Sequence, residues 1–237
     1  ADGSLITPYQ IYGRAKGYPE LFYCEGSTIS LKGSTTRKIA FERTSKQHVR
    51  ISQNTVKDSV LVEKMLMNKQ NFKSAKDVDG FVPQASGLYC IRIKNVHLLP
   101  EPFGTILLER GHDILYIGIA SENLYNRFLN QELRAKGHGT FFRSMGAVLG
   151  YKPPKGSLIE KRNKKNYKFS KTDELKIIGW INENLMVNWV ESAGDLDSLE
   201  TSLIVKYLPL LNLSKNPAAL QILSYLRKEC VEIANRN

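Results

Sequence analysis

The sequence predicts an α+β fold, in which a small central β-sheet is flanked by helices and preceded by a small basic N-terminal α+β module. Residues 87–93 (GLYCIRI) and 113–119 (DILYIGI) are rich in β-branched and aromatic residues and are bounded by glycine or aspartate, as strands are. Several later segments repeat apolar residues at helical spacing. We expect three parts: residues 1–80, residues 81–217 and a C-terminal helix within 218–237.

The 237 residues are enough to bury a real core, and their net charge of +11 is unevenly distributed. Residues 134–171 hold eleven basic residues and one acid, which favours a polyanionic partner over a merely solvated loop. The three cysteines are widely spaced without a CxxC pair, which argues against a disulfide framework and predicts a reducing, cytoplasmic setting. No run approaches the ~20 apolar residues of a membrane span.

The first eighty residues contain β candidates at 21–24 and 28–31, separated by a turn at 25–27, and a further candidate at 46–52. Residues 59–70 have a helical pattern. A polar, charged linker is predicted at 73–79. The basic residues of this module either contact DNA or form a generic soluble surface, and the sequence does not decide between the two.

The remaining elements follow from periodicity and from Gly and Pro. Residues 97–104 contain two prolines in eight residues and are predicted to be an inserted loop. We predict helices and a third strand in the order that follows: helices at 123–136, 141–149 and 175–185, a strand at 186–190, and a helix at 195–208.

Glu200 interrupts the apolar face of the last of these helices. At about 100° per residue, with Leu199 at 0°, Leu203 falls near 40°, Ile204 near 140° and Glu200 near 100°, inside the apolar stripe. A desolvated carboxylate without a partner costs several kcal/mol, so the chain should supply a cation. That cation is either an internal Arg or Lys or a divalent metal.

Five features occur in a recognisable order: Gly87-Leu88-Tyr89, Tyr116-Ile117-Gly118, Arg127, Glu200 and Asn212. Over roughly residues 81–217, this arrangement resembles the GIY-YIG nuclease family. The resemblance implies a double-stranded DNA endonuclease that hydrolyses phosphodiesters with water and Mg²⁺ (or Mn²⁺). The 26 residues between the two tyrosines are longer than in most of the family and favour its restriction-endonuclease branch, in a restriction or defence role.

The resemblance also implies a role for each site residue. Tyr89 would help to activate the water, with Tyr116 assisting through hydrogen bonds, and Arg127 would hold the scissile phosphate. Glu200 would bind the metal, and Asn212 would brace the site. A phenol with a pKa near ~10 is a poor base unless positive charge lowers that pKa.

The chain departs from the family one helical turn after the arginine, where many members have His or Tyr and this sequence has Gln131. Glutamine can orient a water but cannot take its proton. Either Tyr89 alone is the base, or His138 substitutes from the next loop, or the protein is an inactive nucleic-acid-binding protein. A repair or mobile-element nuclease is a further alternative. The sequence leaves the oligomeric state open, with a dimer as one option.

Two groups of residues are candidates for contacts with DNA. Arg143 and Ser144 lie at the start of a predicted helix, where amides and a cation suit phosphates. The basic tract contributes six more candidates, which are Lys152, Lys155, Lys161, Arg162, Lys164 and Lys165. Aromatic residues of the tract, among them Tyr167 and Phe169, either stack on bases or anchor the tract to the core, and anchoring is favoured.

Overall fold

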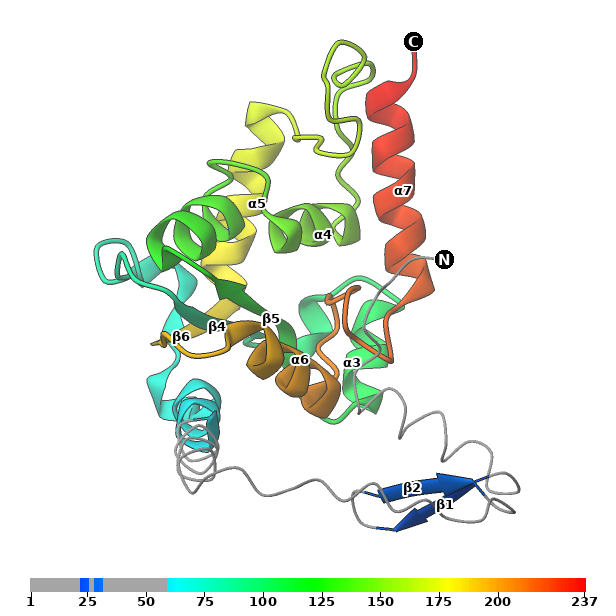
Figure 1. The fold of residues 1–237 in the computed structure, drawn as a ribbon. Coiled ribbons are helices and arrows are strands. Elements are labelled where there is room, and N and C mark those ends of the chain that lie inside the picture. Colours follow the sequence, from blue (N-terminus) through cyan, green and yellow to red (C-terminus); the bar gives the residue numbers. More distant parts are fainter. Residues whose placement is uncertain (1–21, 26–27, 32–58) are drawn as a thin grey trace. The chain divides into compact units, whose positions relative to one another are not determined.

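A computed structural model of the 237-residue chain describes residues 22–25, 28–31 and 59–237 (Figure 1). The chain divides into two compact units, residues 1–46 and 47–237. In the first unit, β1 (Phe22–Glu25) and β2 (Thr28–Leu31) pair antiparallel from Phe22↔Leu31 to Glu25↔Thr28. The two predicted strands are therefore confirmed, whereas residues 26–27 of the predicted turn and the candidate strand at 46–52 lie outside the described residues.

The second unit is built on a four-stranded antiparallel sheet in the order β3-β6-β4-β5. The strands are β3 (Lys73–Ser74), β4 (Gly87–Ile93), β5 (Ile114–Ala120) and β6 (Leu185–Glu191). The α+β class and the three predicted strands of this unit are confirmed. The predicted linker at 73–79 is wrong, because β3 pairs with β6 and a 3-10 turn follows it.

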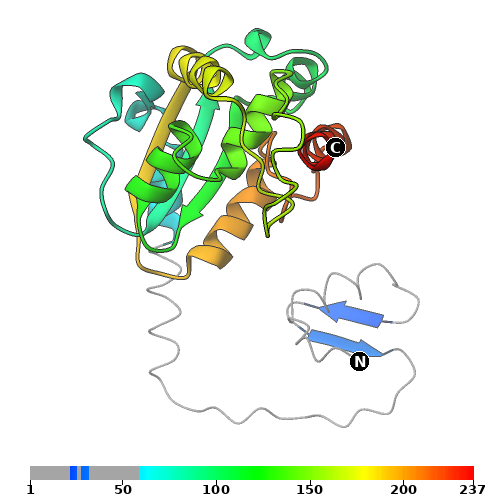
Figure 2. The same cartoon turned by 90° about the horizontal axis from the view of Figure 1, so that it is seen from above.

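Central strand β4 is buried on both faces, and its alternating side chains enter two separate cores. Tyr89 and Ile91 belong to the larger core. Figure 2 shows the green helices of the chain lying over one face of the sheet. Leu88 and Cys90 point into the smaller core, which includes Leu66 of the helical residues 59–67. Because successive side chains of a strand point to opposite faces of the sheet, Tyr89 of the first motif lies in the larger core.

Helices cover the sheet and follow the predicted order: α4 (Thr140–Val148), α5 (Lys171–Asn184), α6 (Leu196–Tyr207) and α7 (Gln221–Asn235), with a π-helix (Tyr125–Leu133) before α4. Ser170 caps α5 and Asp195 caps α6 through their side chains. Helix α7 packs against α4 and buries Leu223, Cys230 and Ala234. The C-terminal helix is therefore part of the same core as the sheet.

The insertion between β4 and β5 is more regular than predicted. It contains a 3-10 turn (Val96–Leu98) and helix α3 (Phe103–Glu109). Pro102 stands directly before α3, where a proline costs the helix no hydrogen bond. Phe103 and Leu107 are buried in the larger core. The predicted irregular loop at 97–104 is therefore wrong in part, because apolar burial stabilises helical structure despite the two prolines.

The basic tract between α4 and α5 is fastened to the core by its aromatic residues. Tyr167 is fully buried, and the ring of Phe169 packs against that of Phe142 with centroids 6.3 Å apart. Gly146 of α4 provides the space for this packing, because a Cβ there would lie 2.4 Å from Cε2 of Phe169. The anchoring role predicted for the aromatic residues is confirmed for Tyr167 and Phe169.

Gly146→Ala should destabilise the fold, whereas Gly179→Ala should not. We expect Gly146→Ala to lower the free energy of unfolding by about 1–3 kcal/mol, the usual cost of overpacking. Gly179, inside α5, has nothing within 4 Å of an added Cβ, so its replacement should raise that free energy by about 0.5–1 kcal/mol through helix propensity. Urea unfolding of both variants tests this, and equal effects would mean that Phe169 does not pack on α4.

Candidate active site

Two adjoining cavities bring most of the predicted site residues together. The first, about 520 Å³, is lined by Tyr89, Tyr116, Arg127 and Glu200 among others. The second, about 250 Å³, shares Tyr116 and Glu200 with the first and adds Asn212. Residues from β4, β5, the π-helix and α6 therefore meet at one place. Five of the six residues predicted for catalysis line these cavities.

The two tyrosines lie on adjacent strands, and the glycine of the second motif makes room for the first tyrosine. Tyr89 pairs with Gly118 across β4 and β5, and a Cβ at Gly118 would lie 2.5 Å from Cζ and Oη of Tyr89. The rings of Tyr89 and Tyr116 are stacked with centroids 6.2 Å apart. Only glycine at position 118 lets the Tyr89 ring lie across the neighbouring strand.

Glu132 is a residue of the site that sequence reasoning missed. Its carboxylate is completely buried and accepts hydrogen bonds from the backbone N–H groups of Thr140 (3.1 Å) and Phe142 (3.2 Å). The Glu132 carboxylate therefore caps the N-terminus of α4. Its Oε1 also accepts a hydrogen bond from the Tyr89 hydroxyl at 3.4 Å. Arg127 forms an ion pair with the same oxygen, with Nη2 at 2.9 Å. The carboxylate thus joins the first-motif tyrosine, the arginine and the next helix.

A sequence signal for Glu132 exists. At about 100° per residue, with Leu124 at 0°, Phe128 falls near 40°, Glu132 near 80° and Leu133 near 180°. Glu132 is therefore as much an interruption of an apolar stripe as Glu200 is. The pairing with Arg127 has no such signal, because residues five apart face each other only when the chain adopts i→i+5 bonding, as this π-helix does.

Arg127 divides its guanidinium between two neighbours, donating from Nη1 to Oε1 of Gln131 at 2.9 Å and pairing through Nη2 with Glu132. Burial by itself lowers the pKa of Arg127, but the negative charge of Glu132 raises it overall. The pKa of Tyr89 is held well above its usual range, first by burial and then by Glu132, with Arg127 opposing both. Neither tyrosine is therefore ionised at rest, since burial raises the pKa of Tyr116 as well.

Glu200 has an internal cation as its partner. Nζ of Lys215 lies 2.7 Å from the Glu200 carboxylate and 2.5 Å from Asp197. Burial alone would lower the pKa of Lys215, and hydrogen bonds to Asp197 and Glu200 raise it overall. The internal partner left open by the helix plot is therefore present. No group of three or more His, Cys, Asp or Glu side chains placed to hold a metal occurs in the described part of the chain.

Asn212 braces β5 along its outer edge. Its side chain accepts from the N–H of Ile117 at 3.0 Å and donates to the carbonyl of the same residue at 2.8 Å. Arg227 of α7 lines the second cavity and donates from Nη1 to the Thr140 carbonyl (3.1 Å) and to Oγ of Ser144 (2.8 Å). No local pattern in the sequence indicates that the last helix reaches the site.

Three predicted site residues do not reach the cavities as expected. His138 lines a separate cavity with Lys161, Arg162 and Lys168, on the side of the basic tract. Arg143 is buried and its guanidinium donates to the carbonyls of Gly139, Lys165 and His138 and to the Asn166 side chain, while Ser144 is fully buried against Arg227. The phosphate-contact prediction for Arg143 and Ser144 is therefore wrong, because both hold the tract and α7 against α4.

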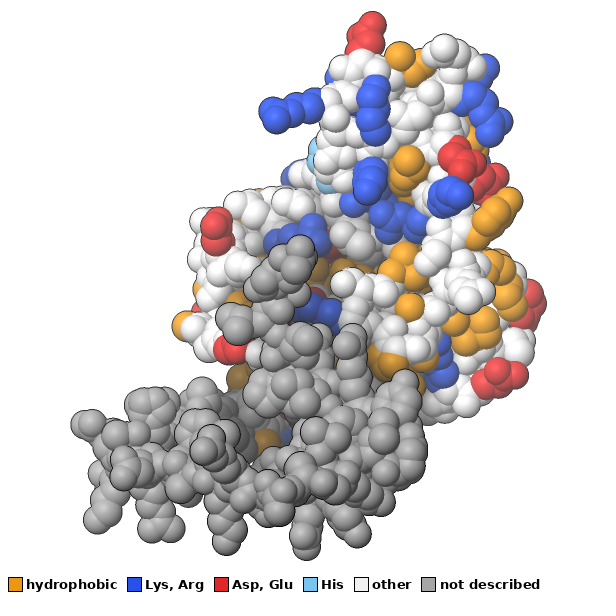
Figure 3. Space-filling model, turned by 45° about the vertical axis from the view of Figure 1, so that its right-hand side comes forward, with side chains coloured by type: hydrophobic (Ala, Val, Ile, Leu, Met, Phe, Trp, Pro, Cys, Tyr) orange, Lys and Arg blue, Asp and Glu red, His pale blue; other side chains and the backbone are white. Residues whose placement is uncertain are grey.

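The cations of the basic tract fall into two classes. Lys152 pairs with Glu229 at 2.6 Å, and Nζ of Lys164 donates to the backbone carbonyls of Leu158 and Ile159. The other four of the six tract residues predicted to contact DNA are exposed and, within the described part of the chain, form no ion pair; they are Lys155, Lys161, Arg162 and Lys165. Lysine and arginine side chains gather on the upper part of the face shown in Figure 3.

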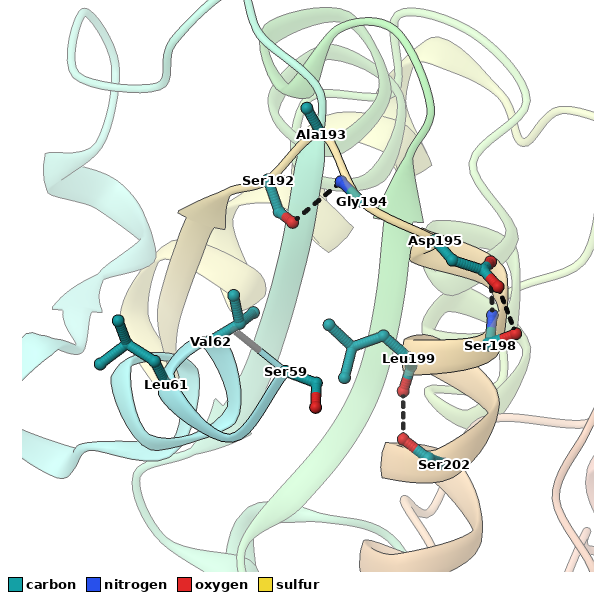
Figure 4. A pocket seen from close by; sticks show the side chains of 10 residues that line it. All are labelled: Ser59, Leu61, Val62, Ser192, Ala193, Gly194, Asp195, Ser198, Leu199 and Ser202. Carbon is teal, nitrogen blue, oxygen red and sulfur yellow. Dashed lines mark hydrogen bonds between the residues drawn. The ribbon is translucent and has the colours of Figure 1, made fainter. Parts of the chain in front are cut away.

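A larger cavity of about 690 Å³ lies elsewhere, between the start of helical residues 59–67 and the segment from Ser192 to Ser202 (Figure 4). Leu61, Val62 and Leu199 supply much of its apolar wall. None of the predicted site residues lines it. The chemistry predicted from the sequence is therefore confined to the two smaller cavities. None of the helices in the described ranges has the length and apolar character needed to cross a bilayer.

Comparison with known proteins agrees with the geometry. The family model of the GIY-YIG catalytic domain matches residues 87–229, from the first residue of β4 into α7. No curated protein and no solved structure matched the chain. The match covers more than half of the sequence and includes every residue that lines the two cavities. The chain therefore belongs to the GIY-YIG family, whose catalytic domain is that of a nuclease, a phosphodiester hydrolase.

Proposed function

We propose that the protein is an Mg²⁺-dependent endonuclease that hydrolyses phosphodiester bonds of double-stranded DNA. The observation that carries this proposal is the convergence of Tyr89, Arg127 and Glu200 on one open cavity. A phosphate in that cavity would have a planar cation on one side and a carboxylate on the other. Phosphodiester hydrolysis uses both kinds of group, because a cation offsets the negative charge that develops on the phosphate oxygens and a carboxylate can hold a metal ion that does the same.

The residues divide the work as follows. Arg127 binds the phosphate and offsets the charge that develops on its oxygens. Tyr89 orients the attacking water and takes part in removing its proton. Tyr116 is stacked beside Tyr89 and lines the second cavity together with Asn212. Asn212 keeps β5, and with it Tyr116, in register through Ile117. His138 faces the separate basic cavity, which favours Tyr89 over His138 as the water-activating group.

Glu200 would hold the metal ion. A single carboxylate completed by waters and substrate phosphate oxygens is ordinary coordination for Mg²⁺, and Mn²⁺ accepts the same ligands. The bound ion would supply Lewis-acid stabilisation of the phosphate oxygens. Lys215 now pairs with Glu200, which supports a cation-binding role for this carboxylate. The donor set therefore fits a metal that competes with Lys215 for Glu200.

The exposed cations Lys155, Lys161, Arg162 and Lys165 support double-stranded DNA as the substrate. The long insertion that contains α3 supports a site-specific restriction or defence enzyme, as the spacer length suggests. A repair or mobile-element enzyme would use the same residues on another target. Cys90 and Cys230 are free, buried thiols, which suits a cytoplasmic protein. Digesting plasmid with Mg²⁺ and mapping the cut ends tests the activity and separates a fixed site from scattered nicks.

An inactive nucleic-acid-binding protein is the second candidate. The observation that favours it is Gln131, whose side chain accepts a hydrogen bond from Arg127 and offers no proton acceptor at the position of the family's His or Tyr. Such a protein would bind DNA through the same exposed cations. It would cut none of several DNAs in Mg²⁺ or Mn²⁺.

Glu200→Gln should separate binding from cleavage. The change keeps the shape of the side chain and removes the charge that would hold the metal. We expect plasmid cleavage to fall by about 10²-fold or more, with the Kd for DNA measured in Ca²⁺ nearly unchanged. Glu109→Gln, an exposed carboxylate on α3, is the matched control and should cut at the wild-type rate. Equal cleavage by Glu200→Gln and wild type would contradict the metal assignment.

Lys215→Gln should strengthen metal binding without DNA. Removing the ammonium frees the Glu200 carboxylate, and a hydrogen bond to a charged group is worth about 1.5–3 kcal/mol, so Mn²⁺ affinity should rise about tenfold or more. Titration of Mn²⁺ followed by electron paramagnetic resonance measures the affinity directly. Lys206→Gln, which breaks the comparable pair with Glu63, is the control and should leave it unchanged. Weaker binding in Lys215→Gln would mean that Lys215 orients the ligand.

Replacing four exposed cations of the tract, Lys155, Lys161, Arg162 and Lys165, with Gln should flatten the salt dependence of DNA binding. Each phosphate contact contributes about −0.9 to the slope of log K against log salt, so the slope should lose up to about 3.6. The control makes the same charge change at exposed lysines outside the tract, namely Lys64, Lys69, Lys76 and Lys228. Equal slopes for the two quadruple variants would show that only net charge matters.

A further inference from the structure

The Glu132 carboxylate has no exposed surface, yet it receives four donors: the hydroxyl of Tyr89, Nη2 of Arg127 and the N–H groups of Thr140 and Phe142. A carboxylate removed from water is retained only with such compensation. The two amide donors hold the carboxylate from the α4 side. The other two donors belong to the residues proposed to bind phosphate and activate water. Glu132 is therefore tied to both halves of the site.

The direction of the hydrogen bond from Tyr89 matters. A phenol has one proton, and Tyr89 donates it to Oε1 of Glu132. The oxygen of Tyr89 can then only accept from any other partner. A water that reached Tyr89 from the cavity would have to donate to it. The hydrogen-bond chain therefore has one possible direction, from water to Tyr89 to Glu132.

Arg127 covers this chain in the free protein. Its side chain is about one-third exposed, whereas Tyr89 and Glu132 have no exposed surface, although Tyr89 borders the cavity. A phosphate that draws the guanidinium toward itself would uncover the Tyr89 hydroxyl and remove the cation beside Glu132. Both changes favour proton movement toward the carboxylate, since the opposite charge that stabilised its ionised form is gone.

We propose that Glu132 is a positioning residue that also accepts the proton of Tyr89 when the scissile phosphate takes Arg127 away from it, an inference that rests on the proposed nuclease function. The oxygen of Tyr89 takes a proton from the attacking water as its own proton passes to Oε1 of Glu132. The resulting hydroxide forms a bond to phosphorus, the bond to the leaving oxygen breaks, and solvent protonates that oxygen. After the product departs, the proton on Glu132 returns through Tyr89 to solvent.

This assignment explains how the chain can work with Gln131. Glutamine cannot accept a proton, but the next residue can, and the π-helix turns that residue toward Arg127 and Tyr89. Burial raises the pKa of Glu132 above its ordinary value, against Arg127 and the amides of Phe142 and Thr140, which lower it. Departure of Arg127 removes the first of the groups that lower the pKa of Glu132. Glu132 is then a better acceptor than an exposed carboxylate.

The test is Glu132→Gln, which keeps the size of the side chain and removes the proton acceptor. We expect the single-turnover cleavage rate to fall about 10²- to 10⁴-fold, the usual value of general-base assistance. The Kd for DNA in Ca²⁺ should stay the same or tighten, because Arg127 is released to bind phosphate. Glu174→Gln, a buried carboxylate paired with Lys171 outside the cavities, is the matched control and should cut at the wild-type rate.

A double variant separates this role from a structural one. If Tyr89 and Glu132 act in one chain, Tyr89→Phe combined with Glu132→Gln should be no slower than the slower single variant. Multiplying losses would overturn the proposal, as would wild-type cleavage by Glu132→Gln. So would a weakened Kd that accounts for the whole loss of rate.

Glu132→Asp serves where Glu132→Gln does not fold. It keeps the charge but withdraws it by one methylene from a hydroxyl already 3.4 Å away. The rate should then fall at least about tenfold with DNA affinity retained, and an unchanged rate would overturn the proposal. A wild-type protein that cuts no DNA in either metal would refute the proposed function and this role together. Wild-type cleavage with an insensitive Glu132 would refute this role alone.

Discussion

The site depends on one buried ion pair, between Arg127 and Glu132. A buried carboxylate deprived of its partners costs several kcal/mol, so the chain surrounds Glu132 with an arginine, a phenol and two amides. The pair fixes the arginine over the first-motif tyrosine. It also fixes α4, since the same carboxylate caps that helix where Gly139 has no side chain to do so. The geometry of the cavity and the position of α4 therefore depend on the same interaction.

The strands and their glycines could be predicted, because β-branched residues, bounding glycines and a period of two are local signals. Glu200 could also be found, since a carboxylate within an apolar helical stripe is visible in the sequence alone. Glu132 gave the same signal, but its partner could not be inferred, because a π-helix changes which residues face each other. Lys215 and Arg227 reach the cavities through tertiary packing of segments that no local pattern connects to the motifs. The insertion was predicted as a loop because its prolines were given more weight than Phe103 and Leu107, which the core buries.

Charge shows a related limit. A count of basic residues identifies the tract but cannot separate cations that build the fold from cations that are free to bind. Arg143 donates its hydrogen bonds to backbone carbonyls and to the Asn166 side chain. Arg134 pairs with Asp79 and donates to the Asn182 side chain and to the carbonyl of Ala75. Arginine suits such work because its planar fork satisfies several acceptors at once. Of the six tract cations predicted to contact DNA, three lysines and Arg162 are exposed without such a partner, and these four are available to a polyanion.

The central claim is that Arg127 exchanges Glu132 for the scissile phosphate. A crystal structure with an uncleavable phosphorothioate DNA duplex and Ca²⁺ tests it most directly. The account predicts a phosphate in the cavity lined by Tyr89, Arg127 and Glu200, with the Arg127 guanidinium within hydrogen-bond distance of that phosphate and no longer on Glu132. A phosphate bound elsewhere, or a phosphate in the cavity while Arg127 still pairs with Glu132, would contradict it.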